Sequence, residues 1–304
     1  PVDQNSFFDG DLQAEIKNGL KFNELRYTAT HNSYQTESLD EFKKVFRNLS
    51  DLSFGLISEK TADFVSPTLT QQLERGIYSF EIDVEVFDED GDVSFTCMHI
   101  PQIQMTTSCY DFELALKEIA MWSDNNPGHL PVTIIIEPKE IFIPMENMKP
   151  FSMKYADDFD ALLRKGLGDK LFTPADMLGD YESFGAMRAD DGWRKVEDML
   201  GKVLILLHDC GTTEKYIESD PTMKTQAMFP MLRANDAKRD CASFLIINNP
   251  EKCDSEFFIN EKKFIVRTRA DEFTSVKEER RKKAFARAFH HECKAIQSRP
   301  FETS

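Results

Sequence analysis

The chain has 304 residues, of which 41% are apolar and 30% are charged, and its formal net charge is −16. The apolar fraction excludes a disordered protein, and the acidity excludes an extended nucleic-acid interface, which needs clustered Lys and Arg. No apolar run reaches the roughly 18 residues that a membrane-spanning helix needs, so no transmembrane segment is predicted.

Short apolar runs alternate with helical patterns along the chain. Most runs are almost continuously apolar, as expected for parallel strands buried on both faces. We predict strands at Leu25–Ala29, Ile77–Val84, Val93–Met98, Val132–Glu137, Val203–Leu207, Phe244–Asn248, Phe264–Thr268 and Ala295–Gln297. We predict helices at Leu39–Phe46, Leu69–Arg75, Tyr110–Asn125, Ala156–Gly166, Trp193–Leu200 and Ser275–Cys293. This alternation favours an α/β barrel of parallel strands.

One connection departs from the alternation. The segment Val86–Val93 contains Asp90-Gly91, a pair typical of a tight turn between antiparallel strands. We therefore predict an irregular (β/α)8 barrel of the TIM type, with a β-hairpin between its second and third strands. No Gly-, Pro- or Ser-rich linker and no internal repeat divides the chain, so residues 1–304 are expected to form a single domain.

The six cysteines are widely separated, and no CxxC pair indicates a zinc ribbon. An even number permits disulfides in an oxidising compartment, and free buried thiols are the alternative. The pairings that we favour are Cys97–Cys109, Cys210–Cys241 and Cys253–Cys293. No signal peptide opens the chain, and we interpret its start as processed, so a secreted or extracytoplasmic location is expected.

In a barrel of this kind, side chains at the carboxyl ends of the strands form the active site. Polar residues follow five predicted strands at this end: His31 and Asn32, Glu81 and Asp83, His99, Glu137 and Lys139, and Arg267 and Arg269. Each has an ordinary structural explanation, because a lone His often makes a structural hydrogen bond and a Glu can cap a helix. Their recurrence after buried apolar runs, where an unpaired charge is costly, favours one functional pocket.

The chemistry of this set points to a hard cation. Glu81 and Asp83 lie two positions apart in a strand, so their side chains point to one face. An imidazole, an amide oxygen and paired carboxylates suit an ion such as calcium beside a phosphate ester.

The ordered set His31-Asn32-Ser33-Tyr34, Glu81-Ile82-Asp83, His99 and Ile136-Glu137-Pro138-Lys139 resembles a known enzyme family. The family is the calcium-dependent phosphoinositide-specific phospholipase C, in its small, stand-alone bacterial and fungal type. The order and spacing agree over residues 25–140, and Val266–Asp271 agrees more loosely. The segment Cys293–Pro300 departs from the signature that often closes bacterial members, so no acid is assigned to the last strand.

The resemblance implies a distorted barrel with one calcium ion. The implied metal ligands are Asn32, Glu81, Asp83 and Glu137. The implied catalytic pair is His31 and His99, with Glu81 or Glu137 as a further proton acceptor. Lys139, Arg267 and Arg269 would offer positive charge to phosphate or to inositol hydroxyls.

The implied reaction is attack of the inositol 2-hydroxyl on the adjacent phosphodiester of a phosphatidylinositol-type lipid. Diacylglycerol leaves, and the cyclic inositol phosphate is open to later hydrolysis. His31 would bind a phosphate oxygen or act as the base, and His99 would protonate the departing glycerol oxygen. The expected partner is a phosphoinositide or related glycerophospholipid at a membrane surface, and a monomer is expected.

Two other functions stay open. A glycerophosphodiester phosphodiesterase shares the barrel, the acid pair and two histidines, although its first motif is usually His-Arg-Gly rather than His31-Asn32-Ser33. A calcium-dependent membrane-binding barrel without turnover is the second, and the intact His31 and His99 argue against it. The segment Ile141–Met153 is either an apolar lip that touches lipid or a packed loop.

Overall fold

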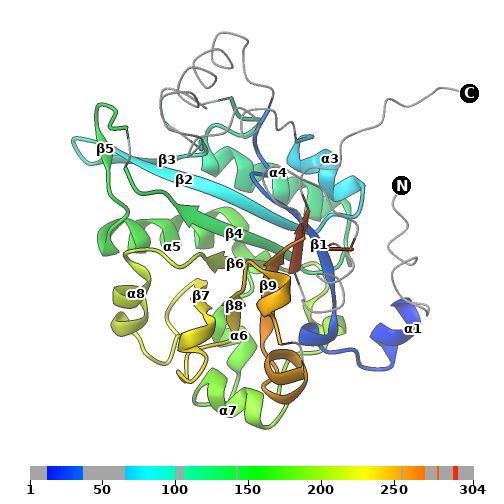
Figure 1. Ribbon diagram of the computed structural model, residues 1–304. Helices are drawn as coiled ribbons and strands as arrows, with labels where there is room; N and C mark the ends of the chain where they lie inside the picture. Colours follow the sequence, from blue (N-terminus) through cyan, green and yellow to red (C-terminus); the bar gives the residue numbers. More distant parts are fainter. Residues whose placement is uncertain are drawn as a thin grey trace, which may run out of the picture.

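The computed structural model describes residues 12–36, 66–99, 101, 106–141, 143–254, 256–270, 279–280 and 290–293. Its centre is a curled sheet of parallel strands with helices outside it, an α/β fold of the TIM-barrel type (Figure 1). The parallel strands are β1 (Tyr27–Thr30), β2 (Ser79–Glu89), β4 (Val132–Pro138), β6 (Val203–Leu207), β7 (Met228–Arg233), β8 (Phe244–Ile246), β9 (Ile265–Arg269) and β10 (His290–Cys293). Pairing runs from β1 through β10, β9, β8, β7, β6, β4 and β2, and β2 also pairs with β1.

Strand β2 continues beyond the parallel sheet. Its first part, Ser79–Val84, pairs with β4, and its second part, Glu85–Glu89, pairs antiparallel with β3 (Asp92–Thr96). The short strand β5 (Met148–Lys149) lies antiparallel on the other side of this extension (Figure 1). The turn from β2 to β3 has positive φ at Asp90 and Gly91, 51° and 97°, which Gly adopts without strain.

Helices connect the strands and cover the outside of the sheet (Figure 1). The α-helices are α1 (Leu12–Lys17), α3 (Leu69–Glu74), α4 (Phe112–Asn125), α5 (Met153–Leu167), α6 (Pro174–Leu178), α7 (Phe184–Ala189) and α8 (Thr213–Ser219). Shorter turns are η2 (Phe22–Glu24), η4 (Gly168–Lys170), η5 (Val196–Met199), η6 (Ala234–Asp236), η7 (Pro250–Lys252) and the π-type η8 (Glu256–Glu261). In the described part of the chain, no helix is long and apolar enough to cross a membrane.

Side chains of the central strands fill the core. Strands β4 and β6 are buried from Val132 to Ile136 and from Val203 to Leu207, which explains their continuous apolar runs. Outside the sheet, Phe159 of α5 packs against the rings of Phe95 and Phe112 at 4.8 and 4.9 Å between ring centroids. Strands β4 and β6 are therefore covered on both faces.

One predicted helix is wrong, a second ends as a strand, and one strand of the barrel was missed. The segment Trp193–Leu200 forms only the 3-10 turn η5, because the backbone of Lys195 pairs with that of Lys21 and cannot continue a helix. The predicted helix Ser275–Cys293 ends as strand β10, which pairs with both β1 and β9. Strand β7 was not predicted, because Pro230 interrupts its apolar pattern.

Two other predicted elements, Leu39–Phe46 and Ala295–Gln297, lie outside the described residues. The remaining predicted strands and helices are found, with ends shifted by a few residues.

Two of the favoured disulfides are also wrong. Cys97, Cys109, Cys210 and Cys241 are free thiols in the structure. Cys97 lies beside Cys109 in the core, and burial raises the pKa of the Cys97 thiol well above its ordinary value. A thiol held neutral in this way behaves as a small core side chain. The third pairing needs the side chain of Cys293, which lies outside the described part.

Candidate active site

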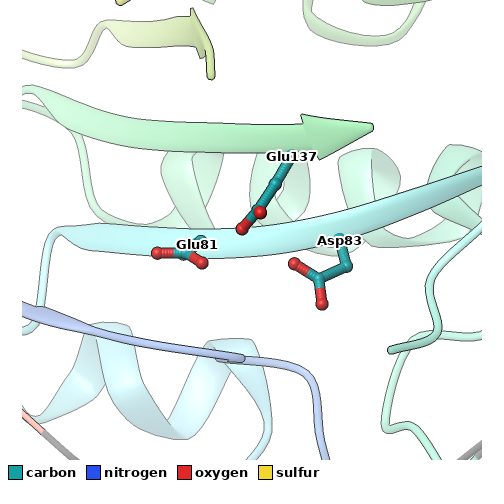
Figure 2. Close-up of side chains that lie close together, drawn as sticks. All are labelled: Glu81, Asp83 and Glu137. Carbon is teal, nitrogen blue, oxygen red and sulfur yellow. The ribbon is translucent and has the colours of Figure 1, made fainter. Parts of the chain in front are cut away.

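Three carboxylates converge where β2 and β4 leave the parallel sheet. Asp83 of β2 lies directly opposite Glu137 of β4 in the strand register, and Glu81 lies two positions before Asp83. Figure 2 shows the three side chains on the same side of the two strands. One oxygen from each lies within 4.8 Å of the others, although Glu81 and Asp83 are almost completely buried. We call Glu81, Asp83 and Glu137 the acidic cluster.

Burial of like charges costs free energy, and for this reason the pKa of Asp83 is raised. This pKa is raised from 3.8 to about 8, chiefly by burial and also by the charges of Glu137 and Glu81. The positive charge of Lys139 and a hydrogen bond from Tyr34 act in the opposite direction. The acidic cluster thus favours any added positive charge.

The turn after β1, which carries Asn32, lies against Glu81 of the acidic cluster. Asn32 has a positive φ of 49°, which Asn tolerates better than most residues. The backbone N–H of Ser33 donates to the carbonyl of Glu81 at 2.9 Å, and the Glu81 N–H donates to Ser33 Oγ at 3.0 Å. These two bonds fix the turn against the start of the acidic cluster.

The side chain of Asn32 fits a ligand of a hard cation. Asn32 is buried, and among the described residues no donor reaches its Oδ1 atom. A buried acceptor without a donor costs free energy unless a cation or water meets it. Calcium prefers carboxylate and amide oxygens as ligands, so Asn32 and the acidic cluster have the chemistry of a calcium site.

Both predicted imidazoles flank the acidic cluster. His31 Nε2 lies 3.4 Å from Glu81 Oε1, and its side chain is 13% exposed. His99 Nε2 lies 4.0 Å from Asp83 Oδ2, and its side chain is 22% exposed. Burial lowers the pKa of His31 to about 3, against the opposing effect of Glu81. Both rings therefore lie beside the carboxylates and still reach solvent.

The three predicted cations lie in different surroundings. Lys139 Nζ lies 3.2 Å from Asp83 Oδ1 and 3.1 Å from Glu137 Oε1. Arg267 has a fully buried side chain, pairs with Glu81 Oε2 at 2.6 Å, and also donates to Asn248 Oδ1. Arg269 is partly exposed at the end of β9, and its charge lowers the pKa of His31.

The sequence did not identify three polar residues of this site. Tyr34 donates its hydroxyl to Asp83 Oδ2 at 2.8 Å, and Asn248 accepts from Arg267. Glu85 is buried next to Asp83 along β2, and burial raises its pKa to about 8. The alternation that identified Glu81 and Asp83 extends to Glu85, so that signal was present. Asn248 ends the predicted strand Phe244–Asn248, so the position that selected the other site residues also applied to it.

Comparison with known proteins agrees with this geometry. The family model for Ca2+-dependent phosphoinositide phospholipase C matches residues 91–298. No curated protein matches the chain.

Solved structures share the fold. The Ca2+-dependent phosphatidylinositol-specific phospholipase C of Streptomyces antibioticus superposes with a TM-score of 0.61 at 18% identity, covering 91% of this chain and 95% of that one. The calcium-dependent phosphoinositol-specific phospholipase C of Pseudomonas sp., in a myoinositol complex, superposes with a TM-score of 0.60 at 18% identity, covering 92% of each chain. Since the family match spans well over half of the sequence, the chain belongs to the calcium-dependent phosphoinositide phospholipase C family.

Proposed function

We propose that this enzyme cleaves phosphatidylinositol-type lipids to diacylglycerol and an inositol phosphate by phosphoryl transfer within the substrate. The observation that carries the proposal is the convergence of the acidic cluster with two imidazoles, 3.4 and 4.0 Å from its carboxylates. The myoinositol complex of the Pseudomonas relative supports an inositol head group as the substrate.

Asn32, Glu81, Asp83 and Glu137 would hold one calcium ion in this proposal. When bound, the ion supplies charge stabilisation to the phosphate and lowers the pKa of the attacking 2-hydroxyl. The fit rests on the buried Asn32 Oδ1, and on the burial and the neighbouring carboxylates that raise the pKa of Asp83.

The imidazoles would move protons and bind phosphate. His99 is the more exposed ring, so it can meet the glycerol oxygen as that oxygen leaves, and we assign it as the general acid. His31 would donate a hydrogen bond to a phosphate oxygen or act as the base, with Glu81 or Glu137 as alternative proton acceptors.

The three cationic side chains differ in how deeply they are buried, and we assign their roles on that basis. Arg267 is fully buried and bound to Glu81, so we assign it to orient this carboxylate rather than to touch the lipid. Arg269 lies nearer solvent, where it can meet the head group. Lys139 lies between carboxylates at the edge of the site, within reach of a bound phosphate.

Several wider features stay predictions for the whole chain. They are an irregular (β/α)8 barrel with a hairpin after its second strand, a single catalytic domain over residues 1–304, a monomer, and a secreted or extracytoplasmic location.

Product analysis tests the function. Vesicles of phosphatidylinositol with calcium should yield diacylglycerol and inositol phosphate, while glycerophosphoinositol should yield no glycerol phosphate. Glycerol phosphate as the product would instead support a glycerophosphodiester phosphodiesterase. Vesicle binding without any cleavage would support the non-catalytic membrane-binding barrel.

A further inference from the structure

Lys139 occupies an unusual position for a residue that binds substrate. Its ammonium lies between two members of the acidic cluster, 3.2 Å from Asp83 Oδ1 and 3.1 Å from Glu137 Oε1. The third member, Glu81, is paired with Arg267. Every carboxylate of the cluster therefore has a cationic side chain beside it. One ammonium that bridges two carboxylates supplies part of the positive charge that a calcium ion would bring.

We propose that Lys139 is an internal counter-cation that occupies the acidic cluster of the calcium-free enzyme and leaves Asp83 or Glu137 when calcium binds. The inference rests on the ligand set of the proposed function. Calcium binds carboxylate oxygens at about 2.3–2.6 Å, so the ion and an ammonium at hydrogen-bond distance from the same oxygens would be crowded together. Two cations that close repel strongly in a buried site.

The backbone and the side chain of Lys139 differ in their freedom to move. The Lys139 N–H donates to the Val84 carbonyl at 3.2 Å, which fixes the backbone to the end of β2. The side chain is 21% exposed, and its stem is flexible, so the ammonium can turn toward solvent. Arg267 lacks this freedom, because it is fully buried and held by both Glu81 and Asn248.

Two consequences follow for the enzyme. Calcium must displace an ion pair, so its affinity is weaker than that of the same carboxylates without the lysine. The displaced ammonium stays at the edge of the site, where it can meet the phosphate of the substrate. Calcium binding thereby makes the Lys139 ammonium available as a second positive charge, beside the ion, for the lipid head group.

Calcium affinity without lipid tests the inference directly. Lys139→Met keeps the stem and removes the charge, and Lys154→Met is the matched control, because Lys154 pairs with Asp88 away from the acidic cluster. Isothermal titration with calcium should give a dissociation constant about tenfold lower for Lys139→Met than for wild type. Lys154→Met should equal wild type. The melting temperature in chelator should fall more for Lys139→Met than for Lys154→Met, because Lys154 is mostly exposed whereas Lys139 pairs with the buried Asp83.

A second measurement on the wild-type protein covers the case in which Lys139→Met does not fold. Limited acylation followed by mass spectrometry reports how accessible each lysine amine is. Lys139 should react slowly in chelator and at least severalfold faster in calcium, while Lys154 should react equally in both. Equal reactivity of Lys139 in both conditions would overturn the inference.

The outcomes separate this inference from the proposed function. Unchanged or weaker calcium binding by Lys139→Met, with phosphatidylinositol cleavage intact in wild type, overturns the inference alone. Calcium binding that responds to Lys139→Met in a protein that cleaves no phosphatidylinositol supports the inference and removes the function. A wild-type protein that binds no calcium overturns both.

Discussion

At the scale of single residues, the site combines buried charges that each depend on a partner. Glu81 and Arg267 are both almost completely buried, and their charged groups meet at 2.6 Å. Asp83 receives a hydrogen bond from Tyr34 and an ion pair from Lys139. Such pairs add little net stability, but the loss of one member leaves an uncompensated charge in the interior. Site residues are therefore also residues on which folding depends.

Removal of the imidazole of His99 should reduce turnover without unfolding the protein. For His99→Ala we expect phosphatidylinositol cleavage to fall by about 10²-fold or more, since a general acid contributes on that scale. The measurement is kcat on phosphatidylinositol vesicles together with the melting temperature. His208→Ala is the control, because His208 follows β6 and, within the described part of the chain, the hydrogen bond of its ring is the one between Nδ1 and the adjacent Asp209 carbonyl. A near-normal rate for His99→Ala would remove His99 from the mechanism.

Removal of the charge of Arg267 should affect stability first. Arg267→Met leaves Glu81 buried and unpaired, which should lower the free energy of unfolding by about 3–5 kcal/mol in denaturant titrations. Arg233→Met is the matched control, because Arg233 is exposed, pairs with Asp209 at 2.5 Å, and should cost about 0–1 kcal/mol. Calcium affinity should also fall for Arg267→Met alone, because Glu81 loses the bond that orients it, and this loss should outweigh the gain from removing a positive charge. Equal losses in both variants would contradict a role for Arg267 in orienting Glu81.

At the scale of elements, strand β2 joins the site to the outside of the molecule. Its first part carries Glu81 and Asp83 within the parallel sheet, and its second part pairs with β3 and β5. At the far end, Asp88 accepts hydrogen bonds from Lys154 and Tyr155 of α5 at 2.8 and 2.7 Å. These contacts fix the extension of β2 to the helix beside it.

The ion pair between Asp88 and Lys154 should make part of the free energy of unfolding depend on pH in the acid range. Hydrogen bonds from Lys154 and Tyr155 lower the pKa of Asp88 from 3.8 to about 2. A carboxyl whose pKa is lower in the folded state stabilises the protein above pH 3.8, and that contribution is lost as the pH falls toward 2. Asp88→Asn should remove this part of the acid dependence, as measured by melting temperature from pH 5 to pH 2. An unchanged acid profile would show that the contact does not form in solution.

The pairing of distant elements explains why parts of the fold were not predicted. Met228–Arg233 contains Pro230, which disfavours a strand. The segment is nevertheless a strand, because it lies between β6 and β8 and its other backbone groups can pair with both of them. His290–Cys293 has no apolar alternation, and it is a strand because it lies between β1 and β9. In both cases the neighbouring edges decide the conformation, and those neighbours are far away in sequence.

At the scale of the whole molecule, calcium should couple the site to global stability. A ligand that binds only the folded state stabilises it by about 2.7 kcal/mol at a free concentration 100 times its dissociation constant. We expect calcium to raise the melting temperature and excess chelator to abolish phosphatidylinositol cleavage. The circular dichroism spectrum should not change in chelator, because Lys139 and Arg267 already compensate the acidic cluster. Full activity in excess chelator would contradict the metal requirement.

The sequence by itself determined which side chains gather. Continuous apolar runs marked the buried strands, and polar residues that follow such runs must meet where parallel strands end together. That reasoning predicted one site for His31, Asn32, Glu81, Asp83, His99 and Glu137. The structure brings the three carboxylates and the two imidazoles together, and the roles of these residues stay predictions. Only the tertiary structure decided how the charges pair: Arg267 is buried against Glu81, while Lys139 lies within the acidic cluster. The physical reason is that the sign of a charge can be read from a residue type, whereas its partner and its burial depend on distances set by the packed strands.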